Sequence, residues 1–191
     1  MSNNWQFYLN SSTACEAMLE ACRQAKHSID LEQFILTPDV LGLRFITLLR
    51  EKAREGVRVR LLCDAAGSFT LYRSPLAYEL ATVPNLEIAF FNHLIPWTPK
   101  NYTLWYFRNH RKTFVIDNTT AFVGSICLDE SMASWRETSV SITGPVVAEI
   151  GRAFSNMWDR AHKRRHYRRH TSTPSVASWQ YLTSAPLPRQ R

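Results

Sequence analysis

The sequence predicts an α/β fold in which helices flank a central mixed β-sheet, and two observations lead to it. In the first half of the chain, β-rich runs alternate three times with segments of helical spacing in β-α-β-α order, which is typical of an α/β layer with a largely parallel sheet. Beyond residue 106, two β-rich runs meet at Asp117-Asn118, a dipeptide that favours a tight hairpin turn. A hairpin adds antiparallel strands, so we expect a mixed sheet.

Capping and turn residues delimit the elements of the first half. Ser12 or Thr13 is suited to cap the first helix, Asp39 is suited to cap the second, and Gly56 ends the second. Pro75 stands near the start of the third helix, where its fixed φ is favourable. The predicted strands cover residues 5–10, 28–36, 57–64 and 86–92, and the predicted helices cover residues 12–26, 40–55 and 74–82.

The pattern changes in the second half of the chain. Residues 93–106 are rich in proline and aromatic residues without a clear period, so we expect a loop over the edge of the sheet. Gly144-Pro145 opens a helix that we expect to run to about Arg160, with one apolar face. The strands predicted in this half cover residues 110–117, 119–125 and 137–143.

Composition points to one globular domain with a sizeable core. The chain has 191 residues, 45% of them hydrophobic and 12% aromatic, which excludes a disordered protein. We assign residues 1–162 to this domain and residues 163–191 to a basic segment followed by a Ser/Thr/Pro-rich linker or tail. No apolar stretch approaches the roughly 20 residues that span a bilayer, and no secretory signal is expected. Four cysteines without a C-x-x-C pair predict reduced thiols and no zinc site.

The net charge of +7 is concentrated at the end of the chain. Residues 1–158 carry fifteen basic and fifteen acidic side chains, so the charge excess lies entirely in residues 159–191. The body is therefore not a basic nucleic-acid-binding domain. The stretch HKRRHYRRH, residues 162–170, would gain about 1 kcal/mol per Lys or Arg near an anionic lipid leaflet. It would equally contact DNA phosphates, and charge alone does not separate the two partners.

Two polar residues in the predicted hairpin are suited to bind a phosphate group and to react with it. His110 and Lys112 lie two apart in a predicted strand, so their side chains are expected on the same face. An ammonium group fixes a phosphoryl oxygen, and an imidazole nitrogen can attack phosphorus. At the end of the return strand, Gly124 permits close backbone approach and the Ser125 hydroxyl can donate to a phosphate oxygen. Each residue alone would also fit a charged edge strand.

The spacing of the whole set is more specific. H-x-K-x4-D-x6-G-S, filled by His110, Lys112, Asp117, Gly124 and Ser125, resembles the HKD signature of the phospholipase D superfamily. The stretches GVRVRLLCDAAGS, RNHRK, WRETSVSITGP and FSNMWDRA are similar to parts of bacterial cardiolipin synthases, in the same order along the chain. The resemblance implies a phospholipase D-like fold with one HKD half.

The resemblance also implies roles for individual residues. His110 would form a phosphohistidine intermediate, while Lys112 and Ser125 would hold the phosphoryl oxygens, without any metal or cofactor. Glu137, on the next predicted strand, would accept a hydrogen bond from His110 and fix its tautomer. The alternative for Glu137 is a surface glutamate beside Arg136. Asp117 belongs to the catalytic signature, yet its turn position predicts that it braces the hairpin or pairs with a basic residue.

The sequence departs from the family pattern at two points. Cys127 stands where the family usually has asparagine, and a thiol is a poorer hydrogen-bond donor than an amide. Only one HKD motif is present, whereas cardiolipin synthases carry two. A symmetric homodimer would supply the second histidine. Alternatively the chain is the first half of a longer enzyme, because SWQYLTSAPLPRQR resembles the connection between the two halves.

Three functions follow from these patterns. The first is a phosphatidyl transferase of the cardiolipin synthase type, bound peripherally to anionic phospholipid on the cytoplasmic side of a bacterial membrane. It is supported by the aromatic residues of the 93–107 loop, which are suited to a lipid interface. The second is a dimeric HKD phosphodiesterase or nuclease. The third is a non-catalytic remnant, suggested by the single motif and by Cys127.

Overall fold

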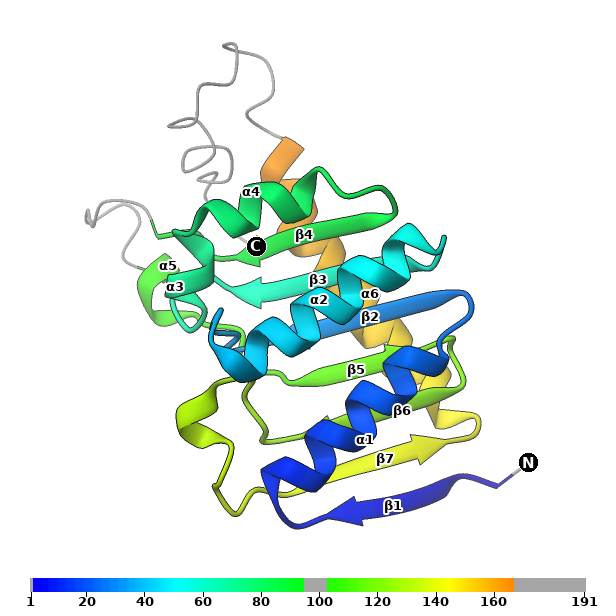
Figure 1. Ribbon diagram of the computed structural model, residues 1–191. Helices are drawn as coiled ribbons and strands as arrows, with labels where there is room; N and C mark the ends of the chain where they lie inside the picture. The colour runs from blue at the N-terminus through cyan, green and yellow to red at the C-terminus, as the bar shows by residue number, and fades with distance from the viewer. Residues whose placement is uncertain (1, 95–102, 167–191) are drawn as a thin grey trace, which may run out of the picture.

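The computed structural model describes residues 2–94 and 103–166 and consists of one seven-stranded sheet with helices on both faces (Figure 1). The strand order is β1-β7-β6-β5-β2-β3-β4. The strands are β1 Asn4–Tyr8, β2 Ser28–Gln33, β3 Arg58–Asp64, β4 Leu86–Phe91, β5 Thr113–Ile116, β6 Thr120–Gly124 and β7 Ser139–Thr143. The helices are α1 Ser11–Gln24, α2 Val40–Arg54, α3 Phe69–Tyr72, α4 Pro75–Ala81, α5 Thr103–Tyr106, the 3-10 helix η1 Glu130–Met132, and α6 Val146–His166.

The sheet is mixed, as the sequence predicts. Strands β2, β3 and β4 pair in parallel, and every other neighbouring pair of strands is antiparallel. The expectation of a largely parallel sheet is therefore wrong outside these three strands. Strands β5, β6 and β7 form consecutive antiparallel pairs beside β2, which separates β1 from β2 and leaves β1 at the edge beside β7.

Capping residues begin the first two helices. The cap of α1 is Asn10, whose side chain accepts a 3.0 Å hydrogen bond from the Thr13 amide, so the expected caps Ser12 and Thr13 are wrong. Asparagine suits this position as well as serine does, and local sequence does not choose between them. Asp39 caps α2 as expected, accepting a 2.9 Å bond from the Gly42 amide.

Apolar side chains fill the space on both sides of the sheet. Helices α1 and α2 cover one face, and α6 crosses the other (Figure 1). Strand β2 is buried along its whole length, including Asp30 and Glu32. A buried carboxylate requires a partner, and Asp30 accepts bonds of 2.7 and 2.6 Å from Arg60. The Arg60 guanidinium in turn lies 4.9 Å from the centre of the Phe154 ring on α6.

Helix α6 is longer than expected. It is described as far as His166, so it includes the first residues of the basic segment. Phe154 and Trp158 pack it against the sheet. The rest of the basic segment and the Ser/Thr/Pro-rich stretch lie outside the described residues, as does most of the aromatic loop before residue 103. Within the described ranges, no helix is both long enough and apolar enough to cross a membrane.

Candidate active site

His110 and Lys112 lie at the sheet edge where β5 begins, next to the end of β2. Strand β5 starts only at Thr113, so the two residues precede the strand and the expected strand geometry is wrong. Their side chains nevertheless meet. Lys112 Nζ lies 3.3 Å from His110 Nδ1 and donates a 3.1 Å bond to the His110 carbonyl oxygen. The pair therefore forms in an irregular segment ahead of β5 and not within a strand.

An aromatic ring supports both members of this pair. The Phe34 ring lies 4.2 Å from the His110 imidazole, centre to centre, at an interplanar angle of 44°. Lys112 Nζ lies 5.3 Å from the centre of the same ring, a cation–π arrangement. His110 itself is exposed, whereas Lys112 is only 8% exposed. Sequence reasoning missed Phe34, because it placed this residue inside the strand predicted over residues 28–36, whereas β2 ends at Gln33.

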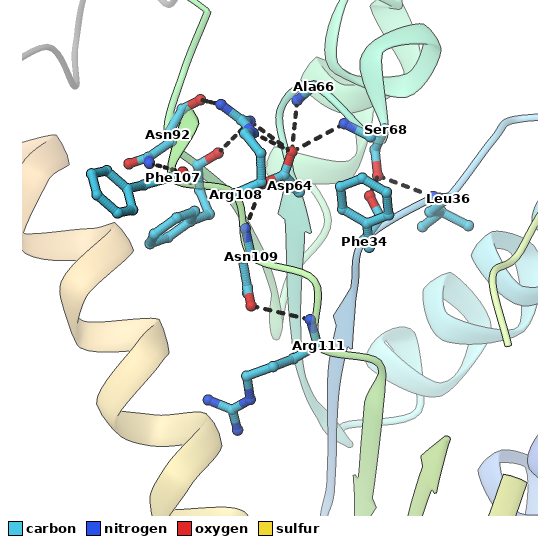
Figure 2. Close-up of polar contacts among 12 residues, drawn as sticks. Phe34, Leu36, Asp64, Ala66, Ser68, Asn92, Phe107, Arg108, Asn109 and Arg111 are labelled. Carbon is cyan, nitrogen blue, oxygen red and sulfur yellow. Dashed lines mark hydrogen bonds and ion pairs between the residues drawn. The ribbon is translucent and has the colours of Figure 1, made fainter. Parts of the chain in front are cut away.

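A buried carboxylate of β3 holds the segment that precedes His110. Asp64 has no exposed surface and accepts bonds of 3.0 and 2.6 Å from Nε and Nη2 of Arg108 (Figure 2). It also accepts a 2.9 Å bond from the backbone amide of Asn109. The Oδ1 atom that accepts from Arg108 also accepts from the amides of Ala66 and Gly67, at 2.9 and 3.0 Å. These charge-assisted bonds join the end of β3 to the chain that enters the site.

A second buried carboxylate, Glu32 of β2, holds the residues on both sides of His110. Its Oε1 accepts a 2.7 Å bond from Asn109 Nδ2, and its Oε2 lies 3.3 Å from Arg111 Nη2. Asn109 Oδ1 accepts a 3.3 Å bond from the Arg111 amide (Figure 2). Burial raises the pKa of Glu32, while the bond from Asn109 and the charge of Arg111 oppose the rise. Sequence reasoning missed both carboxylates, because it treated them only as strand residues.

Gly124 and Ser125 lie at the end of β6 that is next to the start of β5. Strand β5 pairs its first residue, Thr113, with Val123, which directly precedes Gly124. A Cβ atom at Gly124 would lie 2.5 Å from the Thr138 carbonyl oxygen. The close backbone approach at this glycine is thus to the chain entering β7, while an approach to a phosphate stays a prediction. Ser125 is exposed, and its amide donates a 3.1 Å bond to the Thr138 carbonyl.

Glu137 belongs to the same edge but has a different partner from the expected one. It lies two residues before β7 begins, and its Oε2 accepts a hydrogen bond from Ser125 Oγ. The partner in this structure is the Ser125 hydroxyl, and the bond from His110 stays a prediction. Gly124, the last residue of β6, pairs with Ser139, the first residue of β7, so Ser125 and Glu137 both lie directly beyond the paired ends of these strands.

Cys127 stands close to this group. Burial raises the pKa of its thiol, the Lys112 charge opposes the rise, and the Glu137 charge adds to it. The thiol is therefore neutral at physiological pH. Its Sγ lies 4.0 Å from the Ser125 carbonyl oxygen, which is a weak contact at most. The position that the family fills with a strong amide donor is thus occupied here by a weak one.

Asp117 is not part of the cluster around His110. It lies in the β5–β6 turn at the opposite end of β5, with a φ of 51°, followed by Asn118 with a φ of 53°. Its carboxylate accepts bonds of 2.8, 2.7 and 2.7 Å from the amides of Lys26, His27 and Ser28. Burial alone would raise the pKa of Asp117, but these three donors outweigh it and lower the pKa. Asp117 braces the hairpin, through backbone amides and not through a basic side chain.

Exposed aromatic side chains flank the segment that leads into the site. Trp105, Tyr106 and Phe107 are all exposed at the end of α5 and directly after it. Phe69, at the start of α3, is exposed as well. The Phe107 carbonyl accepts a hydrogen bond from Asn92 Nδ2, which fixes the backbone beside these rings (Figure 2). Within the described part of the chain, no group of three or more His, Cys, Asp or Glu side chains is arranged to hold a metal ion.

A family model and the curated relatives that match this chain point to the same protein family. The family model described as cardiolipin synthase, PLD-like domain, matches residues 18–158. Cardiolipin synthase A of Pseudomonas fluorescens (strain SBW25) is 33% identical over 165 residues, which cover 82% of this chain and 33% of that protein. The chain thus spans about a third of the length of the curated relatives it matches.

Solved structures share the fold at low sequence identity. NucT from Helicobacter pylori superposes with a TM-score of 0.64 at 13% identity, covering 83% of this chain and 97% of that one. Nuc from Salmonella typhimurium, a phospholipase D family member, gives a TM-score of 0.58 at 16% identity, with coverages of 83% and 95%.

Proposed function

Because the chain belongs to the cardiolipin synthase family of phospholipase D-like domains, we propose that it acts as a phosphatidyl transferase on phospholipid phosphodiesters. The observation that carries the proposal is the exposed His110 imidazole, whose Nδ1 lies 3.3 Å from the Lys112 ammonium. A nucleophile beside a fixed cation is the arrangement that phosphoryl transfer requires.

The reaction takes two steps. A ring nitrogen of His110 attacks phosphorus, a phosphohistidine forms, and the first alcohol leaves with a proton from a general acid. A second alcohol then attacks the phosphohistidine, loses its proton to the same group, and releases His110. Lys112 and Ser125 stabilise the charge on the phosphoryl oxygens in both steps. Glu137 holds the Ser125 hydroxyl before substrate binds, and we assign it the further role of orienting His110 in the loaded site.

The general acid comes from a second HKD motif. The chain carries one such motif, so a single copy has the nucleophile without its counterpart. Either a second copy of the chain or a further half of a longer protein supplies the other histidine. A homodimer pairs two His110 residues across a twofold axis.

The observations favour a lipid over a nucleic acid as substrate. Residues 1–158 carry no net charge, which does not favour binding to a polyanion. Trp105, Tyr106 and Phe107 are exposed next to the His110 segment, and such side chains suit the headgroup region of a bilayer. The basic residues that follow position 162 add attraction to an anionic leaflet. We therefore assign the protein to the cytoplasmic membrane surface.

A second candidate is a phosphodiesterase that works as a one-motif dimer. The observations that favour it are the fold shared with NucT and with Nuc, a phospholipase D family member, and the same His110–Lys112 pair. A third candidate is a non-catalytic binding module. It is favoured by Cys127, a weak hydrogen-bond donor at a position where the resemblance predicts an asparagine amide.

One experiment separates the three. The protein is incubated with phosphatidylglycerol vesicles and, separately, with single-stranded DNA, as wild type, as His110→Ala and as His27→Ala. His27 is an exposed histidine whose backbone amide donates to Asp117 at the opposite end of β5, so its variant controls for loss of an imidazole. Cardiolipin and free glycerol, formed by wild type and His27→Ala but not by His110→Ala, are the expected products. DNA cleavage with the same dependence would favour the phosphodiesterase, and no product from folded protein would leave the binding module.

A further inference from the structure

The segment Arg108–Arg111 forms neither helix nor strand, yet buried groups hold it on both sides of His110. We propose that Asp64 and Glu32 are positioning residues that fix the His110 imidazole for attack. The reaction that the positioned imidazole carries out rests on the proposed function. The position of the imidazole itself depends only on contacts within the chain.

Asp64 acts on the backbone of the histidine segment. It binds the Arg108 guanidinium through Nε and Nη2, and its other oxygen accepts the Asn109 amide at 2.9 Å. Asn109 directly precedes His110, so the position of that amide determines where the His110 backbone begins. Arg108 is tied a second time by a 3.0 Å bond from Nη1 to the Asn92 carbonyl (Figure 2). The segment therefore cannot shift along the sheet edge without breaking charge-assisted bonds.

Asp64 also acts on the ring that supports the imidazole. Its carboxylate receives the Gly67 amide at 3.0 Å, which fixes the turn after β3. A Cβ at Gly67 would lie 2.2 Å from the Phe34 carbonyl oxygen and 2.9 Å from two ring atoms of Phe34. Ser68 Oγ donates a 3.0 Å bond to the same carbonyl. The turn thus sets the place of Phe34, and Phe34 packs against His110.

Glu32 completes the arrangement from the neighbouring strand. It accepts the Asn109 side-chain amide at 2.7 Å and lies 3.3 Å from Arg111 Nη2. The residues immediately before and after His110 are therefore both tied to one rigid strand. Burying carboxylates costs free energy that their ion pairs often fail to recover, so the two groups are poorly explained as stabilisers of the fold alone.

Asp30 provides a matched comparison within the same sheet. Like Asp64, it is a buried aspartate that accepts two bonds from an arginine, in this case Arg60 at 2.7 and 2.6 Å. Unlike Asp64, it has no contact with the histidine segment, because its partners Arg58 and Arg60 lie on β3. Loss of either carboxylate removes a buried ion pair, but only loss of Asp64 releases His110.

The test compares Asp64→Asn and Glu32→Gln with Asp30→Asn in the full chain. The first readout is the 13C-labelled His110 imidazole resonance, assigned by its absence in His110→Ala. The second is kcat and KM on phosphatidylglycerol. We expect the Asp64 and Glu32 variants to shift or broaden the His110 resonance and to lower kcat about 10- to 100-fold, with KM within about threefold. We expect Asp30→Asn to lower Tm comparably while resonance and kcat stay as in wild type.

Two outcomes overturn the proposal. One is an unchanged His110 resonance in folded Asp64→Asn and Glu32→Gln. The other is an equal response in Asp30→Asn, which would make the effect one of general stability. If Asp64→Asn does not fold, Arg108→Gln removes the guanidinium and leaves the backbone bonds of Asp64, and the same resonance decides. If wild type turns over no phosphodiester, the proposed function fails, whereas the resonance still tests the positioning.

Discussion

The Lys112 ammonium lies 3.3 Å from His110 Nδ1 and 3.1 Å from the carbonyl oxygen of the same residue. Lys112 thus contacts both the side chain and the backbone of the histidine. Its stem is nearly buried, with the ammonium over the Phe34 ring, so the charge is held in one place beside the exposed imidazole. A fixed cation of this kind stabilises developing phosphoryl charge without reorganisation during the reaction.

Replacing this lysine should therefore affect the chemical step. We expect Lys112→Met to lower kcat about 10²- to 10³-fold, as loss of a preorganised charge donor does elsewhere. Lys112→Arg should not restore the rate, because a planar guanidinium does not reproduce a point charge in a site shaped for an ammonium. Steady-state kinetics on phosphatidylglycerol checks both, with circular dichroism to confirm folding. Recovery of the rate by arginine would show that only the net charge counts.

Cys127 offers a gain of function. We expect Cys127→Asn to raise kcat about tenfold, because a hydrogen bond to a charged oxygen contributes about 1.5 kcal/mol or more and the neutral thiol is a weak donor. Cys127→Ala serves as the control for the loss of sulfur. Equal rates in the asparagine and alanine variants would mean that this position does not contact the phosphoryl group.

Asp117 should affect stability and not the rate per folded molecule. Its pKa is lowered in the folded protein, so its stabilising contribution is present above the unfolded-state pKa and is lost as the pH falls through the folded-state pKa. We expect Asp117→Asn to reduce the free energy of unfolding by about 1 kcal/mol at pH 7. The difference from wild type should shrink at pH 3. Urea unfolding at both pH values measures this, and a fall in kcat of fully folded variant would contradict a purely structural role.

Two glycines should respond to alanine with opposite signs. At Gly124 the added methyl would meet backbone atoms of Thr138 and Ser139 at 2.5 and 2.7 Å, so the hairpin must shift. We expect a loss of about 1–3 kcal/mol in the free energy of unfolding. At Gly151 on α6 the methyl would meet Asn118 Oδ1 at 3.4 Å, and alanine favours the helix by up to about 1 kcal/mol. Thermal unfolding of the two variants side by side checks the contrast.

Secondary-structure features that depend on neighbouring residues, or on the spacing of a motif, could be predicted from the sequence. The hairpin at Asp117-Asn118, the Asp39 cap and the mixed sheet follow from local patterns. The choice of Asn10 over Ser12 as a cap was not decidable, because both side chains are good acceptors. The end of α6 was placed too early, since the basic residues after Arg160 include no helix breaker.

The geometry of the candidate site could be predicted from the sequence only in part. Motif spacing identified His110 and Lys112 as partners, but it assigned their proximity to a strand. The strand begins later, at Thr113, and Glu32 and Asp64, more than 40 residues away in the sequence, bind the chain ahead of it. Such long-range ion pairs leave no periodic trace, so neither carboxylate was recognisable from the sequence. The same limit applies to Glu137, whose partner is decided by where β6 ends.

The anchoring of Arg108 by Asp64 and by the Asn92 carbonyl has one more consequence. It separates His110 from α5, because a displacement of α5 would have to break the bonds of the Arg108 guanidinium before it moved the histidine. We therefore expect substitutions up to Phe107 to leave the His110 imidazole in place. Under the proposed function, substrate preference and the position of the histidine would then be free to change independently.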